Sequence, residues 1–97
     1  MTTAPDTIER EVWATLAEFR HGLALAFPDG VSEGPGAFIV IAPPAAMEIA
    51  LTELAPRAIA LLVMPRMKVS IRMTAGTPEE QRAMLRRMDL AMQRGGG

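Results

Sequence analysis

The sequence predicts an α+β fold, in which a four-stranded, mostly antiparallel sheet carries an N-terminal and a C-terminal helix on one of its faces. Two segments with helical spacing of apolar residues stand toward the ends of the chain. Short apolar runs bounded by proline or glycine lie between them, as strands do. The expected order is therefore α-β-β-β-β-α, within a single domain over residues 1–97.

The first helix is expected to begin after Asp6 and to end near Phe27. Asp6 can cap the helix, with Glu9 three residues later completing a capping box. Pro28 and Gly30 then supply the residue types of a tight turn. The apolar residues that recur at helical spacing are Ile8, Val12, Leu16, Phe19 and Leu23.

Four apolar segments between the helices are interpreted as strands, over residues 37–42, 45–54, 58–63 and 67–73. Gly36 and Pro43 bound the first of them, as turn residues bound a buried strand. Residues 32–36 are interpreted as a loop or as the start of an edge strand. A break is expected at Pro56-Arg57, and a hairpin turn is expected over residues 64–67 because proline favours such positions.

The segment 45–54 allows two interpretations. Met47, Ile49 and Leu51 alternate with Glu48, Ala50 and Thr52, as in a half-buried strand, whereas the content of Ala, Leu and Glu also suits a helix. The alternation favours the strand, because helix propensity is a weak influence that tertiary contacts override. The helix alternative would give the order α-β-α-β-β-α.

The last strand and the last helix have the clearest patterns. In residues 67–73, apolar side chains alternate with Lys68, Ser70 and Arg72, so one face of this strand should be polar. Thr77, Pro78 and Glu80 suit the cap and first turn of the last helix. Five methionines fall on the expected inner faces of this strand and this helix, where we expect them to pack in the core: Met67, Met73, Met84, Met88 and Met92.

The composition excludes several classes of function. The formal net charge is −1, which gives no overall attraction to nucleic acid or to an anionic membrane. There is no cysteine, so disulfides, thiolate metal sites and thiol nucleophiles are absent. The first residues lack the pattern of a signal peptide, and the apolar runs fall short of the roughly 20 residues that a spanning helix needs. We therefore expect a cytoplasmic protein that does not enter membranes.

No catalytic, cofactor or metal motif is recognisable. His21 is the single histidine, and we expect it on the surface near the end of the first helix. The acidic pairs Glu9/Glu11 and Glu79/Glu80 are explained by first helical turns, where carboxylates are favourable. We expect no enzyme activity, no cofactor and no metal.

The two halves of the chain differ in charge. Residues 1–48 carry seven acids and two bases, a net −5, whereas residues 49–97 carry four acids and eight bases, a net +4. Such opposed charges can pair within one chain or between copies. The basic residues that we single out as candidates for binding are Arg66, Lys68, Arg72 and Arg86.

These observations favour a non-catalytic protein-interaction or accessory module, a homodimer or a binder of another protein, that self-associates through the sheet face or an edge strand. The alternative is a protein that binds a small anionic ligand, or a minor enzyme, with arginines converging in a pocket. A nucleic-acid-binding module ranks third, because stacking platforms need aromatic residues and only four are present.

Overall fold

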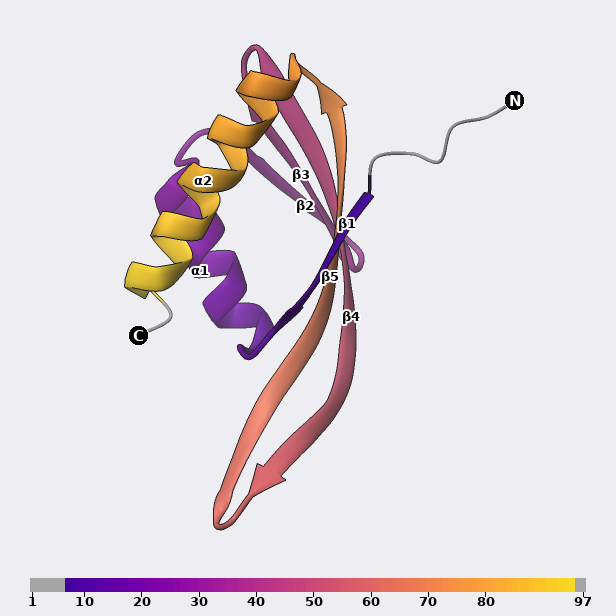
Figure 1. Ribbon diagram of the computed structural model, residues 1–97, viewed down its shortest axis with the longest axis vertical. Helices are drawn as coiled ribbons and strands as arrows, with labels where there is room; N and C mark the ends of the chain where they lie inside the picture. The colour runs from indigo at the N-terminus through magenta and orange to yellow at the C-terminus, as the bar shows by residue number, and fades with distance from the viewer. Residues whose placement is uncertain (1–6, 96–97) are drawn as a thin grey trace, which may run out of the picture.

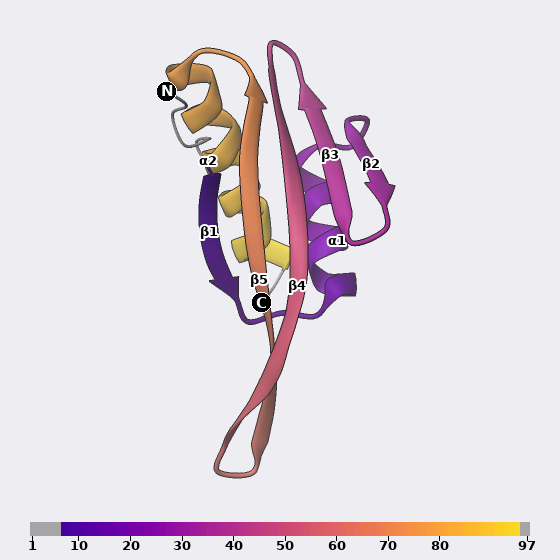
Figure 2. The same cartoon turned by 90° about the vertical axis from the view of Figure 1, so that its right-hand side faces the viewer.

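In the computed structural model, which describes residues 7–95, five antiparallel strands form one sheet and two helices cover one of its faces (Figure 1). The elements along the chain are β1 (Thr7–Val12), α1 (Leu16–Ala26), β2 (Val31–Gly34), β3 (Ala37–Ala42), β4 (Ala45–Ile59), β5 (Leu62–Ala75) and α2 (Pro78–Gly95). Across the sheet the order is β1-β5-β4-β3-β2, so the two longest strands lie at its centre (Figure 2). The predicted α+β class is confirmed, with five strands in place of four.

The core lies between the helices and the inner face of the sheet. Alternate residues of β3, β4 and β5 face the helices, because successive side chains of a strand point to opposite faces. Phe19 of α1 packs against Phe38 of β3 with ring centroids 6.1 Å apart, and Leu23 is completely buried. Three of the five methionines expected in the core, Met67, Met84 and Met88, are buried, and the other two pack against it.

The expected helix over residues 6–27 is wrong in its first part. Residues 7–12 form the edge strand β1, which pairs with β5 from Thr7 opposite Arg72 to Val12 opposite Met67. Ile8 and Val12 therefore reach the core by strand alternation, while Glu9 and Glu11 lie on the other face instead of in a first helical turn. Asp6, the expected cap, lies outside the described residues.

The helix α1 begins nine residues later than its expected first turn, at a second capping box. The Glu18 N–H donates to Thr15 Oγ1 at 3.1 Å, and the Thr15 N–H donates to Glu18 Oε1 at 2.8 Å. Antiparallel pairing with β5 along all of residues 7–12 outweighs the helical spacing of their apolar residues. Helix α2 starts as predicted, since Thr77 and Glu80 exchange the same two hydrogen bonds at 2.8 and 3.2 Å.

Residues 45–54 form a strand, as the alternation favours, but this strand continues to Ile59. The expected break at Pro56-Arg57 is instead a bulge within β4, and residues 64–67 lie inside β5 rather than in a turn. The turn is at Ala60-Leu61, in the middle of the segment predicted as the third strand. Residues 32–36 supply the short edge strand β2 and the turn to β3.

Candidate functional site

Strands β4 and β5 continue past the rest of the sheet as a two-stranded β-hairpin. The last backbone contact of β4 with the β2–β3 hairpin is the Leu51 N–H to Gly36 O hydrogen bond of 3.0 Å, and β1 ends opposite Met67 of β5. Residues 54–66, here called the arm, therefore pair only with each other within the described part of the sheet. Figures 1 and 2 show the arm projecting away from both helices.

The tip of the arm is apolar and uncovered. Leu61 is 99% exposed, Val63 70%, Leu62 65% and Ile59 49%. Ile59 and Leu62 are cross-strand partners on one face, and Val63 opposes Ala58 on the other, so both faces of the ribbon present aliphatic groups. Transfer of one such side chain from full exposure to full burial contributes about 1.5–3 kcal/mol. Covering this tip would therefore stabilise a complex by several such contributions.

The extended arm has no packing of its own to stabilise it. An isolated two-stranded hairpin is at best marginally stable in water, and a third strand or a packed helix is normally needed. The radius of gyration is 14.0 Å, above the roughly 13 Å typical of a compact domain of about 100 residues. The excess follows from the arm, which extends the longest dimension to 45 Å.

A bulge at the base anchors the arm to the body. Between the pairs Leu54/Arg66 and Arg57/Met64, β4 has two residues where β5 has one. The Arg66 side chain donates from Nε to the carbonyl oxygen of Ala55 at 2.9 Å, and its Nη1 lies 3.3 Å from Glu11 Oε2 on β1. Arg66 therefore ties the irregular backbone of the arm to the edge strand of the sheet.

Both strands of the arm contain a proline. Pro56 lies in the bulge of β4, and Pro65 lies opposite it in β5. Proline has no N–H to donate and is typical of edges and bulges, where it hinders pairing with a further strand. The prolines thus disfavour the addition of a further strand along the arm, and they favour contacts made by the side chains at its tip.

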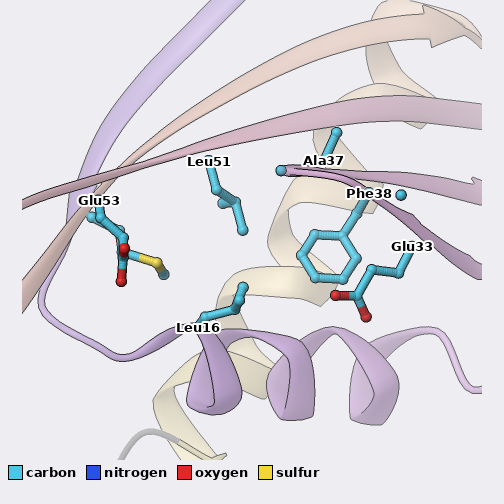
Figure 3. Close-up of a pocket in the computed structure, with 9 residues that line it drawn as sticks. Leu16, Glu33, Ala37, Phe38, Leu51 and Glu53 are labelled. Atoms are coloured by element: carbon cyan, nitrogen blue, oxygen red, sulfur yellow. The ribbon is translucent and has the colours of Figure 1, made fainter.

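A cavity of about 250 Å³ opens on the inner face at the base of the arm (Figure 3). Phe38, Leu51 and Met67 of the sheet form its apolar floor, and Leu16 closes it from the first residue of α1. The floor residues belong to or border the core, whereas Leu16 is partly exposed. The remaining lining residues are Glu33, Gly34, Gly36, Ala37 and Glu53. We call this hollow the arm-base cavity.

The charged residues of the arm-base cavity are both acidic. Glu33 accepts two hydrogen bonds from Arg20 of α1, at 2.8 and 2.7 Å. These hydrogen bonds, more than the charge of Arg20, hold the pKa of the Glu33 carboxyl below its ordinary value. Glu53 has no ion-pair partner among residues 7–95, and it is exposed at the rim. The cavity thus combines an apolar floor with a negative rim.

The four predicted binding residues are not brought together. Arg66, Lys68 and Arg72 follow one another on the outer face of β5, where they pair with Glu11, Glu9 and Glu48 respectively. Arg86 lies on α2, in the helix layer on the other side of the sheet. Four of the five ion pairs between described residues join the two halves of the chain, and three of them join a base of the basic half to a carboxylate of the acidic half.

The outer face of the sheet is divided between charge and apolar surface. Ion pairs cover β1 and β5, while Ile39 and Ile41 of β3 are about half exposed. His21 is exposed on α1, and the described residues contain no group of three acidic or histidine side chains placed to hold a metal. In the same part of the chain, no helix has the length and apolar character needed to cross a membrane.

No protein-family model matches the chain, and no curated protein matches its sequence. The site is therefore interpreted from its own geometry. Sequence reasoning missed the arm because it placed a turn at residues 64–67. The signal that could have identified the arm is the run from Ile59 to Val63, in which five apolar residues follow one another without a polar one. No helix adjoins this run in the chain to cover these side chains.

Proposed function

We propose that this chain is a non-catalytic protein-interaction module that self-associates, and that the arm makes the contact. The observation that carries the proposal is the exposure of Ile59, Leu61, Leu62 and Val63 on a hairpin that leaves the body of the domain. Contiguous exposed apolar surface of this kind is typical of interaction sites. The bulge and the Arg66 contacts hold the hairpin in one direction, which reduces the entropy lost on binding.

The outer sheet face is a weaker candidate for the contact than the arm. Its basic residues are already paired with carboxylates of the same chain, so little charge is left to attract another copy. Ile39 and Ile41 offer a smaller apolar area than the tip of the arm. The same pairing weighs against the anionic-ligand alternative, because three of its four proposed cations would first have to leave an ion pair.

Nucleic-acid binding is also less well supported. Phe19, Phe27 and Phe38 are buried in the core and are not available for stacking on bases. The fourth aromatic residue, Trp13, lies between β1 and α1 and is partly exposed. The apolar arm therefore carries the stronger argument.

The proposal is tested by measuring solution mass by light scattering over a range of protein and salt concentrations. We expect wild-type protein to dimerise at micromolar concentration. Leu61→Asn, which is nearly isosteric but polar, should raise the dimer dissociation constant by about tenfold or more, because each burial of a leucine is worth at least that factor. The matched control is Leu25→Asn on α1, at a leucine that is 52% exposed.

The control variant should dimerise as wild type does. A wild-type protein that stays monomeric at every concentration would rule out self-association. A dimer weakened by Leu25→Asn and not by Leu61→Asn would assign the contact to the helix, and one weakened by Ile39→Asn alone would assign it to the sheet face.

A further inference from the structure

We infer that the tip of the arm of one copy inserts into the arm-base cavity of a second copy, and that a two-fold axis makes this exchange reciprocal. The inference rests on the proposed function and adds the surface that receives the arm. It follows from four features of the described residues: the position of the cavity, its charge, its size and lining, and the prolines at the edges of the arm.

The cavity lies where a second arm would deliver its tip. Leu51, Glu53 and Met67, at the base of the arm, form part of its lining, and Leu61 stands at the opposite end of the same hairpin. When two identical hairpins lie side by side and antiparallel, the tip of each reaches the base of the other. A two-fold arrangement therefore satisfies both contacts with one geometry, as an isologous interface requires.

The charges of the arm and of the cavity are complementary. The two charged residues of the arm, Arg57 and Arg66, are both basic. Arg66 is paired with Glu11, whereas Arg57 has no ion-pair partner among the described residues. The arm-base cavity presents Glu33 and Glu53. Because Glu33 is already paired with Arg20, Glu53 is the carboxylate left to attract an incoming basic arm.

The size and the chemistry of the cavity suit aliphatic side chains. Its volume of about 250 Å³ is below the roughly 300–1,000 Å³ typical of small-molecule sites. Its floor of Phe38, Leu51 and Met67 offers apolar contact without a buried polar group that would need a partner. The tip, with Leu61 foremost, presents the matching aliphatic surface.

The arms themselves are suited to packing by their faces. One face near the tip carries Ala58 and Val63, which are small enough to let two ribbons approach closely. Pro56 and Pro65 hinder strand addition along the edges, so open-ended growth of a sheet is disfavoured. A closed dimer is the arrangement that uses the apolar faces and leaves the edges free.

The test uses the absence of cysteine from the chain. Leu61→Cys at the tip and Leu16→Cys in the cavity are made as separate variants, and one of them is isotope-labelled so that a mixed disulfide is recognised by its mass. After mixing and mild oxidation, we expect the mixed disulfide to form. Leu25→Cys, on α1 but outside the cavity, is the matched partner for comparison.

The Leu61→Cys/Leu16→Cys product should exceed the Leu61→Cys/Leu25→Cys product by about tenfold, because proximity within a dimer raises the effective concentration of the thiols. Wild-type dimers without this preference would overturn the inference while leaving the proposed function in place. A disulfide between two Leu61→Cys tips would overturn it in favour of a tip-to-tip contact. Wild-type protein that stays monomeric, and that floats with phosphatidylglycerol vesicles in a flotation assay, would overturn both proposals, because the arm would then bind a lipid surface instead of a second copy.

Discussion

The body of the domain and its arm use the same kinds of side chain in opposite ways. In the body, the inward-facing residues of β3, β4 and β5 are buried in the core or packed against it, beneath the helices. In the arm, Ile59 to Val63 are apolar without interruption, and no described element covers them. The body is thus stabilised by its own packing, whereas the apolar tip of the arm is left exposed to solvent.

Four of the five ion pairs between described residues join two residues of the body. The body uses ion pairs across its strands and helices, including Arg10 with Asp89 and Arg72 with Glu48. In the arm, Arg57 is left without such a partner among the described residues, and Arg66 acts as an anchor at the base. The arm is thus joined to the body by one ion pair among the described residues, between Arg66 and Glu11.

The largest expected contrast comes from the same substitution made in each region. Leu23→Ala removes a completely buried side chain from α1 and should lower the free energy of unfolding by about 2–5 kcal/mol. Leu61→Ala, at the tip, should change it by less than about 0.5 kcal/mol. Urea unfolding followed by circular dichroism, at a protein concentration too low for association, measures both. A large loss from Leu61→Ala would mean that the arm packs on its own body.

An intermediate effect is expected where the arm joins the body. Arg66→Met keeps the aliphatic stem but removes the hydrogen bond to the carbonyl of Ala55 and the contact with Glu11. A net loss of about 1 kcal/mol is expected for such an interaction. Hydrogen exchange of the arm amides should accelerate while that of the body strands is unchanged.

Lys68→Met is the matched control for Arg66→Met. It removes the exposed ion pair with Glu9 at 3.5 Å, which is expected to contribute at most about 1 kcal/mol, and it leaves the bulge intact. Arm amides that exchange equally fast in both variants would show that Arg66 does not anchor the hairpin.

The smallest effect concerns pH and the rim of the arm-base cavity. The folded-state pKa of Glu33 is lowered, first by its hydrogen bonds from Arg20. A lowered pKa means that the pair stabilises the fold above the unfolded-state pKa of Glu33, and that this contribution is lost as pH falls through the folded-state pKa. Titration of the Glu33 carboxyl by NMR should show an upward shift of its pKa in Arg20→Gln. An unchanged pKa would exclude the hydrogen bonds as its cause.

The parts of the fold that the sequence predicted well are those with local signals. The capping residues Thr77 and Glu80 specified the start of α2, and the alternation in residues 67–73 specified which face of β5 is buried. The methionines were assigned to the core by the same alternation and by helical spacing. In each of these cases the deciding contacts lie within a few residues of one another.

The first helix was mispredicted because two capping boxes compete within the same stretch. Asp6 with Glu9 and Thr15 with Glu18 fit one pattern equally well, and the apolar residues from Ile8 to Leu23 satisfy helical spacing throughout. The edge of β5 decides between them, since it offers residues 7–12 a strand to pair with. That edge is more than 50 residues away in the chain, so no local pattern reports it.

The candidate site was out of reach for a similar reason. Proline at position 65 suggested a turn, but the bulge opposite it and the anchor from Arg66 let both prolines lie within strands. The turn at Ala60-Leu61 contains no glycine or asparagine, the residues that usually indicate a hairpin turn in a sequence. Ala60 nevertheless adopts a positive φ of +54°. The basic residues chosen from the sequence have carboxylate partners on strands that the sequence alone does not bring together.

The sequence by itself determined the α+β class, the start of α2, the inner faces of the central strands and the aliphatic and methionine core, because periodicity and capping act over short distances. The tertiary structure alone decided that residues 7–12 pair with β5 and that opposite charges meet across strands. It also decided that β4 and β5 extend beyond the adjacent strands of the sheet. Those outcomes depend on which strands end first and which remain uncovered. Such relations arise between distant segments and exist only once the sheet is assembled.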